Sequence, residues 1–268
     1  AGAKTGIPLG RPLFRGLRQK AGLDSLRLLV SGGGPLAAST ADFFSELGFT
    51  IVQGYGMSEN GPLITTNTEK HCDNRSAGLP VFRTDIRIAD RDEDGVGEIR
   101  VTSPSLMLGY FRNEEATRES FTGDGYLRTG DLGYFDKRGF LFISGRSKNM
   151  IVTAGGKNVF PEEIEALFPD DGPVAEVLVM GQRLRESMGE RVIAVCVPDY
   201  EGLEEKHGRL PTDEEIERMV REEVAGVNRK LESHQKIERT FIKKEPFEKT
   251  ASDKVKRFYY RDYTEPES

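Results

Sequence analysis

The residues best suited to chemistry in this chain lie in a glycine-rich hexapeptide that runs from Gly54 to Glu59. Its two glycines allow a backbone to turn sharply and to approach a ligand closely. Tyr55 offers a flat face to a base, Ser58 can donate a hydrogen bond to a phosphate oxygen, and Glu59 can hold Mg²⁺ through its carboxylate. These residue types suit a nucleotide, although an ordinary turn between a strand and a helix would look the same.

Two other segments offer groups of the same kind. A run of three glycines, Gly32, Gly33 and Gly34, follows a short apolar stretch. Asp131 comes directly after a glycine, and its carboxylate could accept hydrogen bonds from two ribose hydroxyls. An ordinary aspartate in a turn would have the same local sequence. When Asp131 is considered alone, that interpretation is favoured over a ribose site.

Nearer the carboxyl terminus, Arg146 could reach a ribose or a phosphate. The pair Gly155 and Gly156 could let a narrow ligand pass close to the backbone. A β-hairpin with solvated charges would contain the same residues. The basic stretch from Lys249 to Arg257 is, by composition, typical of a solvated tail or a weak polyanion patch.

Two familiar motifs are excluded. The acidic run from Asp90 to Gly95 begins like a calcium-binding loop, but its twelfth position is Val101, where a bidentate glutamate is required. No Gly-x-x-x-x-Gly-Lys-Ser/Thr segment occurs, which excludes a P-loop NTPase. The three histidines lie far apart and match neither a catalytic triad nor a zinc-ligand spacing.

The composition predicts a globular cytoplasmic protein. Hydrophobic residues make up 37% and charged residues 31% of the 268 positions, as in ordinary globular domains. The net charge of -6 favours neither nucleic acid nor an anionic membrane as a partner. Cys72 and Cys196 match no disulfide framework or metal motif, which favours a reducing cytosol. No apolar run approaches the roughly 18 residues of a transmembrane helix. A homodimer is compatible with the sequence, and the absence of an initial Met suggests a fragment.

Residues 26–64 must position the first glycine segments. A strand at 26–30, a helix and a strand at 50–52 have the spacing of a βαβ unit with parallel strands. We expect the helix to have Ser39 as its N-cap and to end at Gly48. Its apolar face consists of Phe43, Phe44 and Leu47. Both glycine segments would then leave the carboxyl ends of their strands, where open α/β sheets bind ligands.

Residues 76–144 show a different pattern, in which apolar and polar residues alternate. Ile86 and Ile88 precede an Asp-Gly turn at 94–95, and Ile99 and Val101 follow it, which is a hairpin signature. A second hairpin is expected around 136–139. This region predicts a small antiparallel sheet or barrel.

Residues 145–268 read as a separate unit that begins with Gly145-Arg146-Ser147-Lys148. Strands are expected at 150–152, 174–180 and 192–197, and Pro161 should open a helix. Thr212 and Glu215 form a capping box before a helix whose apolar residues should be core: Ile216, Met219, Val220, Val224, Val227 and Leu231.

The predicted fold is therefore α/β (α+β overall). It comprises a partial parallel βαβ layer, a small antiparallel β-barrel-like subdomain at 76–144 and a separate C-terminal α+β domain. The two expected domains are 1–144, a portion of a large domain, and 145–268, a mobile C-terminal domain.

Taken together and in this order, the segments resemble the AMP-forming acyl-CoA synthetases. Their superfamily also contains peptide-synthetase adenylation domains and firefly-type luciferases. The resemblance extends from about Leu26 to Arg257 and rests on five segments: Val30 to Leu36, Gly54-Tyr55-Gly56-Met57-Ser58-Glu59, Tyr126 to Leu132, Gly145 to Gly156, and Lys249 to Arg257. It reverses the interpretation of the last, basic segment, which in the family carries the catalytic lysine.

The resemblance implies a nucleotide site. Tyr55 would stack on adenine, Asp131 would hold the ribose with Arg146 beside it, and Ser58 would contact the α-phosphate. Glu59 would hold Mg²⁺. The remaining residues assigned to the adenine and phosphate segments are Gly32, Gly33, Gly34, Gly54, Gly56 and Met57.

The resemblance also implies a two-step reaction, in which ATP converts a carboxylic acid to an acyl-adenylate and coenzyme A then displaces AMP. Lys254 would bridge the acyl and phosphate oxygens, and Lys148 would be the hinge about which the last domain rotates. Gly155 and Gly156 would line the pantetheine path. Within the superfamily, the amino-acid sequences of segments 145–151 and 154–159 most resemble those of long-chain fatty acid ligases. A fatty acid is therefore the expected substrate.

Two departures from the family pattern matter. The Ser/Thr/Gly-rich phosphate loop is absent, so this chain covers about the second half of such an enzyme and is expected to be inactive alone. Asp253 replaces the glycine that many members have before the lysine. An amino-acid or aryl-acid adenylating domain, and a non-catalytic unit that binds nucleotide or is only structural, remain alternatives.

Overall fold

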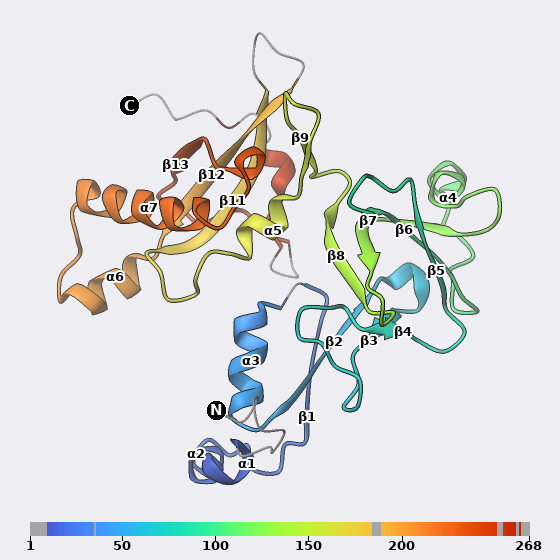
Figure 1. The fold of residues 1–268 in the computed structure, drawn as a ribbon, viewed down its shortest axis with the longest axis horizontal. Coiled ribbons are helices and arrows are strands. Elements are labelled where there is room, and N and C mark those ends of the chain that lie inside the picture. Colours follow the sequence, from blue (N-terminus) through green and yellow to red (C-terminus); the bar gives the residue numbers. More distant parts are fainter. Residues whose placement is uncertain (1–9, 35, 184–188, 251–253, 261–262, 264–268) are drawn as a thin grey trace. The chain divides into compact units, whose positions relative to one another are not determined.

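The computed structural model describes residues 10–34, 36–183, 189–250, 254–260 and 263 (Figure 1). The chain divides into two compact units, residues 1–144 and 145–268. Within the described ranges, no helix is both long and apolar enough to cross a lipid bilayer.

The first sheet of unit 1 contains the predicted βαβ unit. Strands β1 (Leu28–Gly32) and β2 (Thr50–Gly56) pair in parallel, and helix α3 (Ala38–Glu46) connects them. The sheet continues with β3 (Leu63–Thr66) and β4 (Leu79–Pro80) in the order β1-β2-β3-β4, and both of these added pairings are antiparallel. Two short helices, α1 (Gly10–Leu13) and α2 (Arg15–Lys20), precede β1. The parallel pairing is confirmed, and the complete sheet is mixed.

Helix α3 differs in detail from the expectation. Ala37 occupies the N-cap and makes no side-chain capping bond, whereas Ser39 lies inside the first turn. Phe43 is 57% exposed, so the expected apolar face is only partly buried. Gly48 does follow the end of the helix, with a φ of +84° that L side chains rarely adopt.

The second sheet of unit 1 is antiparallel and open. Its order is β5 (Asp85–Ala89), β6 (Gly97–Thr102), β7 (Leu127–Phe135) and β8 (Leu141–Arg146). Both predicted hairpins are present, with glycines of positive φ at positions 95 and 139. Of the two alternatives, sheet and barrel, the described residues form the sheet. Helix α4 (Glu114–Ser120), which was not predicted, begins at an Asn113 cap that accepts a hydrogen bond from Ala116.

The core of unit 1 consists of two small clusters on this scaffold. Ile64, Val101 and Leu127 form one, and Ile88, Ile99 and Leu141 form the other. Tyr55 packs against both clusters. The hydrophobic core therefore fixes a residue that the sequence assigned to the adenine.

Unit 2 is built on a three-stranded sheet with the order β11 (Val174–Arg183), β12 (Glu190–Pro198) and β13 (Arg239–Ile242). β12 pairs antiparallel to β11 and parallel to β13. Its other described elements include β9 (Ile151–Val152), β10 (Asn158–Val159), α5 (Pro161–Glu165), α6 (Tyr200–His207), α7 (Asp213–Asn228) and 3₁₀ turns at Ser233–Gln235 and Arg257–Tyr260.

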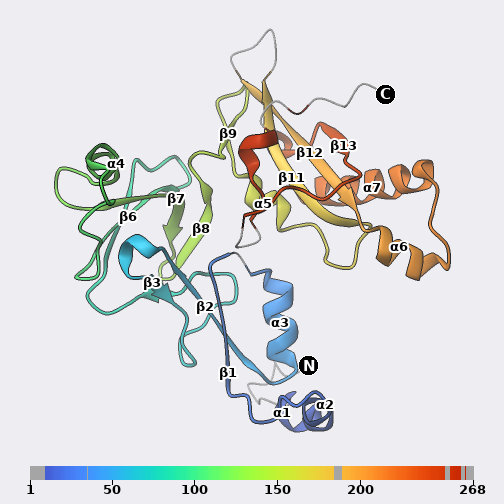
Figure 2. The ribbon, with the colours of Figure 1, turned by 180° about the vertical axis from the view of Figure 1, so that it is seen from behind.

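Strand β12 is buried on both faces because two different layers cover the sheet. Val192, Ala194 and Cys196 face a cluster that includes the apolar side of α7. Ile193 and Val195 face a second cluster formed with the C-terminal segment. Successive side chains of a strand point to opposite faces, so the two clusters lie on opposite sides of the sheet (Figures 1 and 2).

The local predictions for α7 are confirmed. Thr212 and Glu215 form the predicted capping box. Four of the predicted core residues, Ile216, Val220, Val224 and Val227, are buried, and Met219 and Leu231 pack against them. Pro161 opens α5 as expected, although that helix ends at Glu165.

Candidate active site

A hydrogen bond joins the two residues that the sequence assigned to adenine and ribose. The hydroxyl of Tyr55, on β2, donates to Oδ2 of Asp131, on β7, over 2.7 Å. These residues are 76 positions apart in the chain. Asp131 is only 6% exposed. The structure thus brings the two predicted segments together within unit 1.

The position of Asp131 depends on its neighbours within β7. Its N–H donates to Oγ1 of Thr129 over 3.0 Å, and that hydroxyl donates to the carbonyl oxygen of Ile99 over 2.7 Å. Gly130 between them has a φ of +71°, a conformation that glycine adopts without strain. These hydrogen bonds hold Thr129 and Asp131 in place within β7 and against β6.

The glycines at positions 54 and 56 lie within β2 and not in a loop after it. A Cβ on Gly56 would come 1.8 Å from the carbonyl oxygen of Pro62, and one on Gly54 would come 2.9 Å from Leu63. Position 56 must therefore be small whether or not a ligand approaches, because backbone lies where its Cβ would be, whereas the nearest atom to a Cβ on Gly54 is the end of the flexible Leu63 side chain. Sequence reasoning missed this packing role.

The three glycines at the end of β1 and directly after it have more space. A Cβ on Gly32 would meet only the carbonyl oxygen of Gly54, at 3.2 Å, and no atom lies within 4 Å of such a Cβ on Gly33 or Gly34. Gly33 has a φ of +86°. The Gly32 contact shows that the two predicted glycine segments lie side by side in the parallel pair β1 and β2.

The end of the hexapeptide forms a 3₁₀ turn over Ser58–Asn60. Ser58 is exposed, and its carbonyl oxygen accepts a hydrogen bond from Gly61. Met57 is half-buried against the cluster of Ile64, Val101 and Leu127. The Ser58 hydroxyl is therefore accessible to a phosphate, while the residue before it is held by the core.

Glu59 has a partner that the sequence did not suggest. The hydroxyl of Tyr110 donates to Oε1 of Glu59 over 2.9 Å, and the N–H of Met107 donates to the Glu59 carbonyl oxygen. Burial, and then the Glu59 carboxylate, raise the pKa of Tyr110. The two residues are 51 positions apart, so no local pattern could have paired them.

The residues present fit Mg²⁺ held by a single carboxylate. In the part of the chain that the structure describes, no three His, Cys, Asp or Glu side chains form a metal cluster. Mg²⁺ in phosphate-transferring sites commonly takes only one or two carboxylates, and substrate phosphates and water supply its other ligands. Glu59, beside the accessible Ser58, satisfies that requirement.

The predicted hinge is an exposed turn. Arg146 is the last residue of β8, and its carbonyl oxygen accepts hydrogen bonds from the N–H groups of Asn149 and Met150. Lys148 lies inside this turn and is exposed. Gly155 and Gly156 form the turn between β9 and β10, and a Cβ at either position would meet no atom within 4 Å.

Lys254 is exposed, and it lies next to Val255, which forms an isolated antiparallel bridge with Lys249. Its N–H donates to Oγ1 of Thr250 over 3.2 Å, and its carbonyl oxygen accepts from the Thr250 N–H over 2.8 Å. No ion pair joins its ammonium group to another residue in the described ranges. Asp253, the predicted departure from the family pattern, lies outside the described residues.

The predicted site residues thus fall in two groups. Tyr55, Ser58, Glu59 and Asp131 belong to unit 1, whereas Arg146, Lys148, Gly155, Gly156 and Lys254 belong to unit 2.

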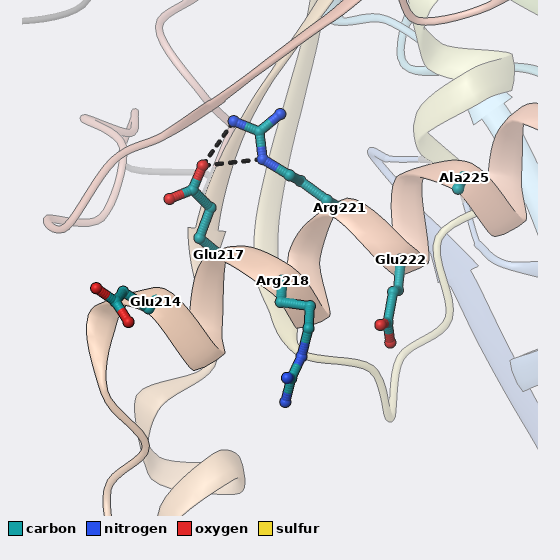
Figure 3. A pocket seen from close by; sticks show the side chains of 6 residues that line it. All are labelled: Glu214, Glu217, Arg218, Arg221, Glu222 and Ala225. Atoms are coloured by element: carbon teal, nitrogen blue, oxygen red, sulfur yellow. Dashed lines mark hydrogen bonds and ion pairs between the residues drawn. The ribbon is translucent and has the colours of Figure 1, made fainter.

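A shallow hollow elsewhere contains none of these residues. It lies on the exposed side of α7 and is lined by Glu214, Glu217, Arg218, Arg221, Glu222 and Ala225 (Figure 3). Arg221 and Glu217 form an ion pair of 2.6 Å on that surface.

Comparison with known proteins decides the family. The model of the AMP-binding enzyme family matches residues 9–111, and the model of the AMP-binding enzyme C-terminal domain matches residues 148–265. The chain belongs to the AMP-binding enzyme family. The first match contains the glycine-rich segments around Gly32 and Gly54, and the second contains the basic segment from Lys249 to Arg257.

Two curated relatives illustrate the range of substrates. The chain is 41% identical over 171 residues to the long-chain-fatty-acid–CoA ligase FadD15 of Mycobacterium bovis, covering 64% of this chain and 27% of that protein. It is 37% identical over 210 residues to 2-succinylbenzoate–CoA ligase of Bacillus mycoides, covering 75% of this chain and 40% of that protein. The chain therefore spans less than half the length of either relative.

A solved structure shows the same fold. O-succinylbenzoate coenzyme A synthetase (MenE) from Bacillus subtilis, in complex with ATP and magnesium ion, matches with a TM-score of 0.68 and 30% identity. The match covers 87% of this chain and 46% of the other.

Proposed function

We propose that the full-length enzyme containing this chain activates a carboxylic acid with ATP and transfers the acyl group to coenzyme A. The observation that carries the proposal is the hydrogen bond from Tyr55 to Asp131, because it joins distant segments whose residue types suit adenine and ribose. Membership of the AMP-binding family supports it, as do relatives named as CoA ligases. The phosphate loop is absent from this chain, so we expect the chain alone to be inactive.

The first step forms the acyl-adenylate. A carboxylate oxygen of the acid attacks the α-phosphorus of ATP, the bond from that phosphorus to the bridging oxygen breaks, and pyrophosphate leaves. A carboxylate is already a nucleophile, so the step needs positioning and charge neutralisation more than a base. Ser58 would contact the α-phosphate, and Lys254 would bridge the acyl and phosphate oxygens. Mg²⁺ at Glu59, when bound, would neutralise phosphate charge.

The second step forms the thioester. The sulfur of coenzyme A attacks the acyl carbon, the bond from that carbon to the phosphate oxygen breaks, AMP leaves and the thiol proton is released. We propose that residues 145–268 rotate about Lys148 between the steps, so that one site serves both. The exposed turn at Lys148 and the open space beside Gly155 and Gly156 support the assigned hinge and pantetheine path.

The proposed acid is a long-chain fatty acid, which the similarity to FadD15 supports. The second candidate is an aryl acid, favoured by the similarity to 2-succinylbenzoate ligases over a larger share of the chain. A pyrophosphate-exchange screen of the full-length enzyme with fatty and aryl acids distinguishes them. Exchange with aryl acids alone would overturn the fatty-acid assignment.

A non-catalytic unit is the alternative of another class. Calorimetry of this chain with AMP, together with pyrophosphate exchange by the full-length enzyme, tests it. AMP binding without exchange supported by any acid would favour the non-catalytic alternative.

The Lys254→Ala substitution tests the assigned step. In the full-length enzyme we expect adenylation to fall about 100-fold or more, since one preorganised charge contact is worth about 3 kcal/mol in such a step. Thioester formation from supplied acyl-adenylate should be retained. Lys230→Ala removes another exposed lysine of unit 2 and should leave both rates unchanged. Equal loss of both half-reactions in Lys254→Ala would contradict the rotation.

A further inference from the structure

A partly buried polar network surrounds Arg257, three residues beyond Lys254. Nη1 of Arg257 donates a hydrogen bond to the carbonyl oxygen of Val179, on β11, over 2.9 Å. Nη2 forms an ion pair with Oε2 of Glu165 and lies 3.9 Å from Oε1 of Glu162, both on α5. The Arg257 side chain is 23% exposed. Because the guanidinium presents several donors in one rigid plane, it is held against a strand and a helix at once.

The two carboxylates are also held from other sides. Oε1 of Glu165 accepts a hydrogen bond from the N–H of Val179 over 2.7 Å. Oε1 of Glu162 accepts one from Nδ2 of Asn149 over 2.6 Å. Asn149 comes directly after Lys148. A continuous chain of polar contacts therefore runs from the proposed hinge, through α5, to Arg257.

Keeping a carboxylate in this network is costly. Burial raises the pKa of Glu165 to about 7, while the charge of Arg257 and the Val179 N–H lower it and the charge of Glu162 raises it. The charged groups that face Glu165 are thus Arg257 and Glu162. An apolar residue would avoid the desolvation penalty, so stability alone does not account for an ionisable group here.

The same segment is fixed on both sides of Lys254. Val255 packs against the apolar cluster that contains Phe247. Lys249 forms an antiparallel bridge with Val255, and its Nζ forms an ion pair of 2.8 Å with Glu176 of β11. Lys249, Val255 and Arg257 are therefore held against β11, α5 and the apolar cluster, while Lys254 is exposed.

We propose that Arg257 is a positioning residue, which holds the Lys254 segment in a fixed place relative to the hinge through Glu165 and Glu162. This inference rests on the proposed function. Lysine has a long, flexible side chain, so its ammonium group can be placed accurately only if its backbone is fixed. A misplacement of about 1 Å in a reacting group can cost about 100-fold in rate. The network should matter for adenylation, which uses Lys254, and not for thioester formation.

The test is Arg257→Met in the full-length enzyme. We expect adenylation, measured by pyrophosphate exchange, to fall about 10- to 100-fold, and thioester formation from supplied acyl-adenylate to stay nearly unchanged. Arg221→Met is the matched control, because Arg221 also pairs with a glutamate but lies on the exposed side of α7 (Figure 3). The control should leave both half-reactions unchanged.

A double substitution separates positioning from general stability. If Arg257 acts through Lys254, Arg257→Met should cause no further loss of adenylation in a Lys254→Ala background. A further loss of the same size, or an equal fall in both half-reactions, would overturn the proposal. Glu165→Gln removes the charge of the carboxylate that pairs with Arg257. It should lower adenylation by a smaller factor than Arg257→Met and leave thioester formation unchanged. This second variant keeps the proposal testable if Arg257→Met fails to fold.

The outcomes also separate this inference from the proposed function. If Lys254→Ala leaves adenylation intact, the role proposed for Lys254 fails. If Lys254→Ala abolishes adenylation while Arg257→Met and Glu165→Gln do not lower it, only the positioning role fails.

Discussion

At the scale of single residues, Tyr55 has two functions that do not compete. Its hydroxyl donates to Asp131, and its ring packs against both core clusters of unit 1. The hydrogen bond orients a carboxylate that is 6% exposed. The residue proposed to contact adenine therefore also holds the residue proposed to bind ribose.

Removing the Tyr55 hydroxyl should destabilise unit 1. In Tyr55→Phe, the Asp131 carboxylate loses a donor in a site that little water reaches, which typically costs about 1–3 kcal/mol. The measurement is the free energy of unfolding of this chain from urea denaturation.

Tyr126→Phe provides the control. The Tyr126 hydroxyl bonds to Asp85, whose side chain is 62% exposed, so water can replace the lost donor. We expect a change below about 1 kcal/mol. An equal loss in the two variants would contradict the explanation from burial.

Glu165 gives a pH-dependent prediction at the same scale. Its pKa is raised mainly by burial from 4.5 to about 7, so the folded state resists ionisation of this group. The stability of the chain should therefore fall as the pH rises from about 5 to 8, by roughly 3 kcal/mol at most.

Glu165→Gln should remove that dependence. The variant should match the wild type near pH 5, where the carboxyl is neutral in the folded state, and should be more stable near pH 8. Thermal unfolding at several pH values measures it. A variant that is less stable at pH 8 would show that the ion pair with Arg257 outweighs burial.

At the scale of elements, the pairing of β2 with β3 explains Gly56, which a ligand alone would not require. The register shifts between Tyr55 and Gly56, so that Gly56 lies opposite Leu63. That irregularity brings the Pro62 carbonyl oxygen to the place of a Cβ on Gly56. The local twist of the sheet and the direction of the Tyr55 side chain both depend on this contact.

Gly56→Ala should therefore lower stability without any ligand present. The added methyl group would meet the backbone of Pro62 and Leu63, so the two segments must separate. Overpacking of this kind costs about 1–3 kcal/mol. Chemical denaturation of the chain measures the effect. Gly123→Ala, where nothing lies within 4 Å of the new Cβ, should change stability little. Comparable losses would argue for a general intolerance of glycine substitution.

At the scale of the whole molecule, the two units have separate cores. No residue of the clusters in residues 1–144 belongs to a cluster in residues 145–268, within the described ranges. Cooperative unfolding requires shared buried contacts, so we expect each unit to open by itself.

Two matched truncations test this independence. Ile216→Ala in α7 and Ile99→Ala in β6 remove buried side chains that are 2% and 0% exposed, at a typical cost of about 2–5 kcal/mol. Hydrogen exchange should accelerate in residues 145–268 for the first and in residues 1–144 for the second. Faster exchange in both units from either substitution would mean that they unfold together.

Sequence patterns predicted the elements whose signals are local. The capping box of Thr212 and Glu215, the proline at the start of α5 and the two hairpins all depend on residues within a few positions of one another. Ser39 failed as an N-cap because the N-cap of α3 is two residues earlier, at Ala37. The strand β2 extends through Gly56 because β3 pairs with it, and the local sequence does not contain that partner.

By itself, the sequence determined the order of the nucleotide segments, the parallel βαβ unit and the apolar face of α7, because spacing and periodicity encode them. Tertiary structure alone decided which distant side chains meet. Tyr55 with Asp131, Tyr110 with Glu59, and Arg257 with Glu165 are each brought together by strand pairing or packing. Such pairs leave no periodic trace in the chain, since each contact depends on the path of the backbone between its two residues.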